Sequence, residues 1–350
     1  MRVVVIGATG NVGTSVLDAL AERDEVEEIV GVARRRPARS FPKTTFVEAD
    51  VTFSDLVPLF TGASAVIQLA WLIQPGRDES ITRAVNVEGS ERVFAAVARA
   101  RVPTLVYASS VGAYSPGPKD RLVDESWPVG GISTSFYSRH KVAVELLLNR
   151  LERDQPDLRV VRMRPTLSFK AQAATEIRRL FAGPFLPRML LRKRLVPFVP
   201  DVSSLKFQVV HSRDVADAYA RAVANRDAHG PFNLAAAPVL SPRELGEILS
   251  ARLLPIPAWL LRLGADAAFR LRLSPSEPGW LDMGLQVPLL DCGRAQRELG
   301  WAPRHDAIVT LTELIDGLGK GSDLETPPLA ATTTGPGRIE ELKTRVGARP

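Results

Sequence analysis

The stretch Val3-Val4-Val5-Ile6-Gly7-Ala8-Thr9-Gly10-Asn11-Val12-Gly13 decides the fold of this 350-residue chain. Its first four residues are a continuous β-branched run, typical of a strand buried on both faces of a sheet. Apolar residues then recur at Val16, Leu17 and Leu20 with the spacing of a helix. Glycines at 7, 10 and 13 separate the two patterns, so the sequence predicts a strand, a tight turn and a helix.

The same glycines have the spacing and the context of a dinucleotide-binding loop. Gly7 permits the tight turn, Gly10 lets the backbone approach a pyrophosphate, and Gly13 allows the helix to pack closely on the strand. The diphosphate would lie at the positive end of the helix, where free N–H groups point outward. We expect the cofactor-binding residues of this loop to be Gly7, Thr9, Gly10, Asn11, Val12 and Gly13.

Short apolar runs alternate with helical stretches through the first half of the chain. Strands are predicted at 29–32, 45–47, 65–69, 104–107 and 159–163, and two long helices at 80–100 and 136–153. This alternation is typical of βαβ units, in which neighbouring strands run parallel. The sequence therefore predicts an α/β fold with a doubly wound, parallel Rossmann-type sheet.

The rest of the chain predicts a smaller second lobe. Residues 166–205 are rich in proline, leucine and basic residues, and short helices dominate from Ser241 onward. Residues 206–210 and 231–234 are predicted to return to the sheet as strands. We expect a Rossmann domain at 1–165 plus 206–235, a discontinuous, mainly helical substrate lobe at 166–205 plus 236–318, and a disordered tail at 319–350.

Composition excludes several classes of protein. With 45% hydrophobic residues, 24% charged residues and a mean hydropathy of +0.01, the chain is typical of a globular protein. One cysteine, Cys292, cannot form an internal disulfide, and the four histidines are scattered, so no metal site is expected. No apolar run reaches the length of about 18 residues that a membrane span needs, and a cytoplasmic protein is expected.

The net charge of +6 favours an anionic partner. Nucleic acid is not expected, because the basic residues are spread along the chain without a patch interleaved with aromatic residues. The apolar and basic segment Ile177–Phe198 leaves open a contact with a lipid surface. Prolines at 184, 187 and 197 break any continuous amphipathic helix there, so a cover over the substrate pocket is the favoured interpretation.

The end of the second predicted strand indicates which dinucleotide binds. An acidic residue at this point would bind the ribose hydroxyls and repel a 2′-phosphate, whereas arginine pairs with that phosphate. The sequence has Ala33-Arg34-Arg35-Arg36 and no acid, so Arg34 and Arg35 favour NADP over NAD. Asp50-Val51 follows the third strand, where a short acidic side chain would meet the adenine amino group.

A second group of residues predicts proton transfer. Tyr137 and Lys141 are spaced i, i+4 and therefore share one face of the helix 136–153. Because a neighbouring ammonium stabilises a phenolate, Lys141 is expected to lower the pKa of Tyr137 from its usual value of about 10. Ser109-Ser110 follows the strand 104–107, at the sheet edge where open α/β proteins bind ligands. A serine there would hold a substrate oxygen beside Tyr137.

Taken in order, these motifs resemble those of the extended short-chain dehydrogenases/reductases, the NAD(P)-dependent epimerase/dehydratase family. The resemblance covers about residues 1–315 and implies a small-molecule substrate and a homodimer formed through the helices 80–100 and 136–153. The matching motifs are Gly7–Gly13, Asp50-Val51, Val66-Ile67-Gln68-Leu69-Ala70, Asn86-Val87-Glu88-Gly89, Ser109-Ser110 with Tyr114, Tyr137–Lys141, Arg164-Pro165, His211–Ala216 and Leu299-Gly300-Trp301.

The resemblance also implies roles for individual residues. Tyr137 would be the catalytic acid/base, and Lys141 would lower its pKa and bind the nicotinamide ribose. Ser110 would orient the substrate oxygen in preference to Ser109, because it lies four positions before Tyr114. Further residues that would contact the cofactor or support the site are Leu69, Ala70, Trp71, Asn86, Pro165, Thr166 and Leu167.

The residues after Ser110 narrow the reaction. Family members that dehydrate nucleotide-sugars have an Asp-Glu pair at this point, whereas this chain has Val111-Gly112-Ala113. Dehydration is therefore disfavoured, and we expect an oxidoreductase or epimerase that transfers a hydride at a carbinol or carbonyl carbon. A catalytically weak NAD(P)-binding sensor is the alternative. Gln68 also departs from the family, which usually has histidine there.

Two classes of substrate stay open at this point. The diphosphate of a nucleotide-sugar would suit Arg178, Arg179 and Lys206. An apolar pocket for a carbonyl compound would be lined by Trp71, Leu72, Phe136 and Phe181.

Overall fold

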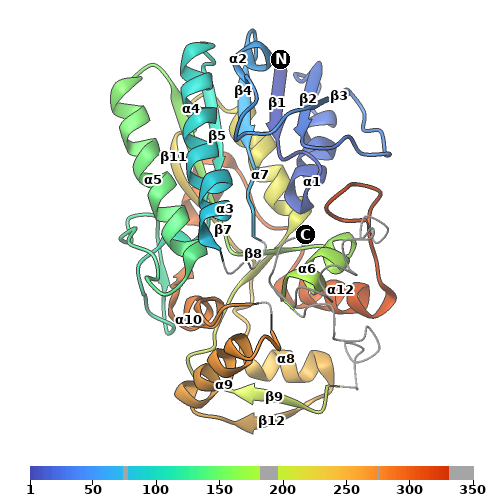
Figure 1. Cartoon of the computed structure of the whole chain (residues 1–350), viewed down its shortest axis with the longest axis vertical. Coiled ribbons are helices and arrows are strands. Elements are labelled where there is room, and N and C mark those ends of the chain that lie inside the picture. The colour runs from blue at the N-terminus through green and yellow to red at the C-terminus, as the bar shows by residue number, and fades with distance from the viewer. Residues whose placement is uncertain (74–77, 182–195, 275, 331–350) are drawn as a thin grey trace.

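The computed structural model describes residues 1–73, 78–181, 196–274 and 276–330 (Figure 1). Seven parallel strands form the central sheet, in the order β11-β7-β5-β4-β1-β2-β3. They are β1 (Arg2–Ile6), β2 (Glu28–Ala33), β3 (Thr44–Glu48), β4 (Ala65–Gln68), β5 (Thr104–Ala108), β7 (Arg159–Pro165) and β11 (Gly230–Leu234). The strand order reverses between β1 and β4, and this is where open α/β sheets bind their ligands.

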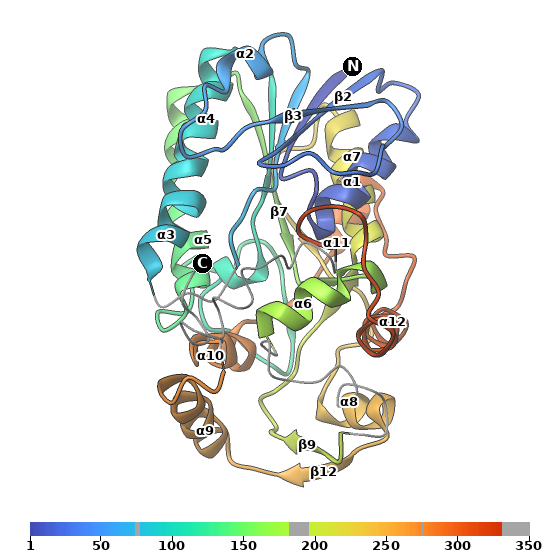
Figure 2. The same ribbon diagram turned by 45° about the vertical axis from the view of Figure 1, so that its right-hand side comes forward.

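Helices cover both faces of the sheet (Figure 2). On one face lie α1 (Asn11–Ala21), α7 (Ser212–Ala224) and α11 (Gly293–Leu299). The other face is covered by α2 (Val57–Phe60), α3 (Glu79–Arg83), α4 (Gly89–Arg99) and α5 (Phe136–Asp154). The predicted α/β class and the doubly wound parallel sheet are therefore confirmed.

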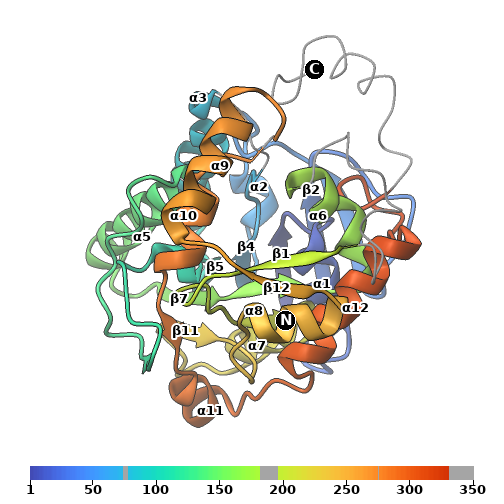
Figure 3. The same ribbon diagram turned by 90° about the horizontal axis from the view of Figure 1, so that it is seen from below.

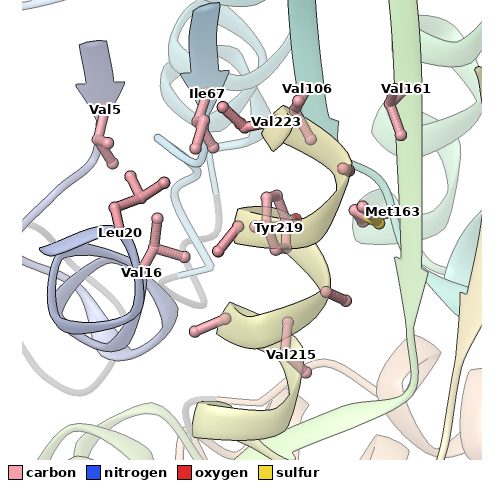
Figure 4. Packing of buried hydrophobic residues seen from close by; sticks show 14 of the residues in the cluster. Val5, Val16, Leu20, Ile67, Val106, Val161, Met163, Val215, Tyr219 and Val223 are labelled. Carbon is pink, nitrogen blue, oxygen red and sulfur yellow. The ribbon is translucent and has the colours of Figure 1, made fainter. Parts of the chain in front are cut away.

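Apolar side chains explain why α1 and α7 lie where they do. Val16 and Leu20 of α1 and Val215 and Tyr219 of α7 point toward the sheet, where they meet strand residues such as Val5 (Figure 4). All five side chains are at most 1% exposed. At about 25 cal/mol per Å² of apolar surface, burial on this scale is the main force that holds the layers together.

One predicted helix and one predicted strand differ from the structure. The helix predicted over 80–100 is interrupted, because residues Ala84–Glu88 form a π-turn between α3 and α4. Residues 206–210 were predicted to join the central sheet. Instead β10 (Val209–His211) pairs with β8 (Leu167–Phe169) in a separate two-stranded sheet. An apolar run predicts a buried strand but not its partner, since pairing depends on the tertiary fold.

The smaller lobe lies beyond the carboxyl ends of the central strands (Figure 3). Its helices are α6 (Ala174–Phe181), α8 (Pro242–Leu249), α9 (Ala258–Arg270), α10 (Gly279–Gln286) and α12 (Ala307–Lys320). Two short parallel pairs complete it, β9 (Phe198–Asp201) with β12 (Arg252–Pro255) and β6 (Leu122–Val123) with β13 (Leu289–Leu290). Most of the segment Ile177–Phe198 lies outside the described residues. No helix of the described chain is long and apolar enough to cross a membrane.

The prediction of a disordered tail over 319–350 is wrong for its first twelve residues. Lys320 ends α12, and the chain continues in an ordered course to Ala330. Thr326 and Leu329 are 1% and 0% exposed. The composition of the segment predicted disorder because it has few apolar anchors, yet one buried leucine and one buried threonine hold it on the fold. Residues 331–350 lie outside the described residues.

Candidate active site

The glycine loop connects β1 to α1 at the reversal point of the sheet. Gly7 has a φ of +80°, and a Cβ there would lie 2.7 Å from the backbone nitrogen of Ala70. A Cβ on Gly13 would lie 2.3 Å from the carbonyl oxygen of Gly7. Only glycine fits at either position, because the close approach of β1, α1 and the residues after β4 leaves no room for a side chain.

Gly10 is different, because the protein itself leaves room for a side chain there. A Cβ on Gly10 would meet only the Gly7 carbonyl oxygen, at an ordinary distance of 3.6 Å. Gly10 is also the N-cap of α1, and no side chain among the described residues caps this helix end. The first N–H groups of a helix have no intrahelical partner and attract anions. The loop therefore fits the diphosphate of a dinucleotide.

Side chains on the flanks hold the loop in place. Asn11 Nδ2 donates to the Ser168 carbonyl at 2.8 Å, and Asn11 Oδ1 accepts from the Ser212 hydroxyl at 2.8 Å. Both ends of the Asn11 side chain are therefore held by neighbouring segments, with one N–H of Nδ2 left over. The buried Lys170 donates to the hydroxyls of Thr14 and Ser15 in α1, at 2.6 and 2.9 Å. Burial lowers the pKa of Lys170 to about 8.

The end of β2 carries three exposed arginines, Arg34, Arg35 and Arg36. The register of β2 and β3 pairs Ala33 with Glu48, and the Arg36 N–H donates to Glu48 Oε1 at 3.0 Å. The structure thus brings an acidic residue to a strand end that has none in its own sequence. Arg34 and Arg35 are exposed and could bind a 2′-phosphate, whereas the nearby Glu48 carboxylate would repel that phosphate.

Further predicted cofactor contacts directly follow β3 and β4. Asp50 Oδ1 accepts from the backbone N–H and the hydroxyl of Thr52, at 2.9 and 2.6 Å, and so shapes its own turn. Val51 is buried and packs where a Cβ on Gly89 would clash, so its side chain belongs to the core. Leu69 donates its N–H to the Ile6 carbonyl at 2.9 Å, which fixes the start of the segment after β4.

Two buried polar atoms at and just after the end of β4 have no partner within the described part of the chain. They are Oε1 of Gln68, at the end of β4, and Nε1 of Trp71. Both belong to side chains beside Ala70, whose backbone lies against Gly7. Unsatisfied buried polar groups are costly, so their presence here fits a site that binds a polar ligand.

Tyr137 and Lys141 lie one turn apart at the start of α5, close to the carboxyl end of β5. The helix begins where Ser135 accepts a hydrogen bond from the Ser138 N–H. Lys141 Nζ donates to the Ala108 carbonyl at 2.7 Å and lies 5.5 Å from the centre of the Tyr137 ring. The predicted juxtaposition of tyrosine and lysine at a strand end is therefore present.

The pKa shifts at this pair are set by burial. Burial raises the pKa of Tyr137 to about 12, and a hydrogen bond with the Ser110 side chain opposes that rise. Burial also lowers the pKa of Lys141 well below its usual value, against the attraction of Glu145. The expected lowering of the Tyr137 pKa by Lys141 is thus not seen in the protein alone, because desolvation disfavours both charged forms.

The two serines after β5 have separate roles. The Ser109 hydroxyl donates to Glu145 Oε1 at 2.6 Å and is buried in that contact. Ser110 caps the short helical turn Val111–Ala113 by accepting from the Gly112 N–H at 3.0 Å, and its side chain contacts Tyr137. Of the two serines, Ser110 is therefore the one whose side chain meets Tyr137.

Aromatic rings enclose Tyr137 on two sides. Trp71 meets its ring edge-on, with centroids 5.8 Å apart, and Trp280 of α10 lies at 5.1 Å. The smaller lobe thus contributes directly to the site through Trp280, which sequence reasoning missed. Gly112 completes the enclosure, because a Cβ there would lie 3.0 Å from the Tyr137 ring.

Asn86 supports the site from the π-turn. Its Oδ1 accepts from the Leu72 N–H at 2.7 Å, and its Nδ2 donates to the Leu72 carbonyl at 3.0 Å. Its Nδ2 also lies 3.5 Å from Nδ1 of His140, the residue before Lys141. Asn86 therefore fixes the segment that carries Trp71 against the helix that carries Tyr137.

A buried ionic network beneath the site was not predicted. Glu145, one turn after Lys141, pairs with Arg164 at 2.9 Å and with Arg162 at 2.8 Å. Burial would raise the pKa of Glu145, but Arg164, Arg162 and the Ser109 hydroxyl together outweigh burial and hold the pKa below its usual value. Arg164 in turn donates to the Tyr114 hydroxyl at 3.0 Å. The i, i+4, i+8 spacing of Tyr137, Lys141 and Glu145 was the available signal.

Pro165 ends β7, Thr166 follows it, and Leu167 begins β8. The N–H and the hydroxyl of Thr166 both donate to the Leu234 carbonyl, at 2.9 and 3.3 Å. That N–H is therefore not available to a cofactor carboxamide, and any backbone contact falls to the neighbouring residues.

Comparison with known proteins shows the family of this chain. The sequence model described as "NAD dependent epimerase/dehydratase family" matches residues 3–235 of this chain. The chain therefore belongs to the NAD dependent epimerase/dehydratase family, whose members are enzymes.

Relatives of known sequence include proteins from several bacteria. An uncharacterized protein of Sinorhizobium fredii is 25% identical over 81% of this chain and 72% of its own length. An uncharacterized protein of Mycobacterium bovis is 27% identical over 88% of this chain, which spans only 29% of that protein's length. The UDP-glucose 4-epimerase of Mycolicibacterium smegmatis is 28% identical over 87% of this chain and 94% of its own.

Solved structures share the fold. The UDP-glucose-4-epimerase of Stenotrophomonas maltophila, with bound NAD and formylated UDP-arabinopyranose, superposes with a TM-score of 0.69 at 21% identity. The match covers 92% of this chain and 99% of that one. The UDP-glucose 4-epimerase of Thermus thermophilus in complex with NAD gives a TM-score of 0.67 at 19% identity, over 91% and 99% of the two chains.

Proposed function

We propose that this protein is an NADP(H)-dependent oxidoreductase or epimerase that transfers a hydride at a carbinol or carbonyl carbon. One observation carries the proposal. Tyr137, Lys141 and Ser110 meet at the carboxyl end of β5, next to a glycine loop whose open position, Gly10, fits a diphosphate. If Tyr137 and Lys141 had only a structural role, they would not need a glycine loop beside them. If the three glycines only formed a turn, they would not need Tyr137 and Lys141 nearby.

In this proposal each side chain has one task. Tyr137 moves the hydroxyl proton of the substrate, and Ser110 holds the substrate oxygen in line with it. Lys141 supplies positive charge next to the phenol, while the Ala108 carbonyl fixes its ammonium. Trp71 and Trp280 exclude water from the phenol, which strengthens these electrostatic interactions. A bound nicotinamide supplies the hydride acceptor or donor.

The choice between the two dinucleotides depends on the end of β2. Exposed Arg34 and Arg35 favour the 2′-phosphate of NADP, because a guanidinium forms paired hydrogen bonds with phosphate. Glu48 and the NAD in the similar solved structures favour NAD. Titration of the protein with each dinucleotide decides between them. Tighter binding of NADP supports the proposal, and tighter binding of NAD overturns this part of it.

We propose a nucleotide-sugar as the first class of substrate to test. The M. smegmatis relative that matches over 94% of its own length is a UDP-glucose 4-epimerase. The aromatic rings around Tyr137 support the second class, an apolar carbonyl compound. Arg178 is buried and has partners, so it is a weaker candidate for a substrate diphosphate than its sequence suggests.

A substrate screen with two readouts tests the function. The protein is incubated with NAD(P) or NAD(P)H and with panels of UDP-sugars, alcohols and carbonyl compounds. Net oxidoreduction changes the nicotinamide absorbance, whereas epimerisation gives a new UDP-sugar on chromatography without net change of the cofactor. Turnover that is lost in Tyr137→Phe supports the proposal. Dinucleotide binding without turnover on any panel would favour the sensor instead.

A further inference from the structure

The chain after α12 forms a strap that runs back to the glycine loop. This C-terminal strap, residues 321–330, begins at Gly321, which ends α12 in a left-handed conformation. The Ser322 N–H donates to the Gly317 carbonyl at 2.9 Å, and the Ser322 carbonyl accepts from the Thr175 hydroxyl at 3.0 Å. The red segment beyond α12 passes beside the start of α1 in two views (Figures 1 and 2).

The strap ends in a buried contact with the loop itself. The Thr326 hydroxyl donates to the carbonyl oxygen of Thr9 at 2.9 Å. Thr326 is 1% exposed and Thr9 is 5% exposed, so this hydrogen bond is shielded from water. Leu329, one turn later, is fully buried, and its N–H donates to the Thr326 carbonyl at 3.0 Å. The strap is therefore anchored at both ends.

Thr9 directly precedes Gly10, the loop position that is open to a ligand. A buried backbone carbonyl needs a hydrogen-bond donor, and the Thr326 hydroxyl supplies one to Thr9. The helix side of the same loop is held by Lys170 through Thr14 and Ser15. The loop is thus supported from both sides, while the surface at Gly10 stays free.

We propose that the C-terminal strap is part of the dinucleotide site and that Thr326 is a positioning residue for the glycine loop. This inference rests on the proposed function, because it assigns the loop to a dinucleotide. Thr326 fixes the Thr9 carbonyl, so that the following N–H groups are already oriented when a diphosphate binds. A loop that is ordered before binding loses less conformational entropy on binding, which increases affinity.

Three variants, each close in size to the residue that it replaces, test the role of the Thr326 hydroxyl. Thr326→Val removes the donor and keeps the shape, Thr326→Ser keeps the donor, and Thr61→Val removes an exposed threonine hydroxyl that donates to Val57. For the wild type and each variant, the dissociation constants of NAD and NADP are measured well below the melting temperature of that protein. One buried hydrogen bond predicts a loss of roughly three- to tenfold in Thr326→Val, with Thr326→Ser and Thr61→Val close to the wild type.

The wild-type chain and two truncations give an independent test. Hydrogen exchange of residues 321–330 is expected to slow when the dinucleotide is added, because the loop and the strap are coupled. A chain that ends at Ala330 is expected to bind like the full chain, and one that ends at Lys320 more weakly. Since loss of buried Leu329 also lowers stability, the truncation results are compared only at temperatures where both variants are folded.

The outcomes separate this inference from the proposed function. If the wild type binds no dinucleotide, both are overturned. If the wild type binds, but Thr326→Val binds equally well or more tightly and exchange in the strap is unchanged, the strap inference is wrong and the proposed function stands. Lower melting temperature of Thr326→Val with an unchanged dissociation constant also overturns it, since the strap then has a purely structural role.

Discussion

The ammonium of Lys141 lies 3.4 Å from the centre of the Trp71 indole ring. At this distance the negative face of the ring attracts the cation, and in a desolvated position the attraction reaches about 2 kcal/mol. The Ala108 carbonyl accepts one N–H of the same ammonium at 2.7 Å. Both contacts favour the charged form of Lys141, whereas desolvation at this buried position lowers its pKa.

This contact predicts an effect of Trp71 on pH dependence. In Trp71→Leu the ammonium loses the indole face and stabilises a Tyr137 phenolate less. In a plot of the substrate-oxidation rate against pH, the rise that requires the Tyr137 phenolate is expected to move to higher pH. Turnover is expected to fall about tenfold for each 1.4 kcal/mol of cation–π energy removed. Trp71→Phe, which keeps an aromatic face, is the control. An unshifted profile in Trp71→Leu would show that the indole does not act through Lys141.

The two serines after β5 are predicted to differ in their effects. Ser110→Ala is expected to lower turnover by about a hundredfold or more, as loss of a proton-transfer partner does. It also removes the cap on the Gly112 N–H, which is expected to cost about 0.5–2 kcal/mol of stability. Ser109→Ala removes a donor to the buried Glu145 carboxylate and is expected to cost about 1–3 kcal/mol of stability. Turnover assays and thermal melts measure both. If Ser109→Ala lost turnover and Ser110→Ala did not, Ser109 would be the serine that holds the substrate oxygen.

The glycine loop allows a comparison of binding with folding. Gly10→Ala places a methyl group in space that the protein leaves open, so the variant is expected to fold with near-normal stability and to bind dinucleotide much more weakly. Gly13→Ala places a Cβ 2.3 Å from the Gly7 carbonyl oxygen and is expected to destabilise the fold by about 1–3 kcal/mol. Normal dinucleotide affinity in Gly10→Ala would contradict the placement of the diphosphate at this loop.

Lys170 predicts how stability changes with pH. Its folded-state pKa is lowered to about 8 by burial, so between about pH 8 and the unfolded value near 10.4 the unfolded chain binds the extra proton. The free energy of unfolding should therefore rise with pH in this window, by at most about 1.4 kcal/mol per pH unit. Lys170→Met should lack this rise, whereas Lys43→Met, at an exposed site, should keep it. Denaturant titrations at several pH values make the comparison, and equal slopes in Lys170→Met and the wild type would contradict it.

Local patterns in the sequence were sufficient to predict the glycine loop and the helix that carries Tyr137 and Lys141. Gly7, Gly10 and Gly13 lie within seven consecutive residues, and Tyr137 and Lys141 lie in one helix. The short spacing along the chain therefore determines how the residues of each group are placed relative to one another. The same holds for Ser110, whose position at a strand end follows from the β5 run.

Contacts between distant segments could not be predicted in this way. The Thr326 hydroxyl and the Thr9 carbonyl are 317 positions apart, and no periodicity connects them. Trp280 reaches Tyr137 from the other lobe, and Glu48 reaches Ala33 through the register of two strands. The pKa of Tyr137 depends on total burial, which a neighbouring lysine in the sequence does not reveal.

The most direct test of the central claim is the effect of Tyr137→Phe on turnover and on dinucleotide affinity, measured on the same preparation with a substrate from the screen. The account predicts a loss of turnover by at least about a hundredfold, as expected for removal of a general acid/base, with the dissociation constant of the dinucleotide nearly unchanged. Turnover that survives in Tyr137→Phe would contradict the assignment of proton transfer to this phenol.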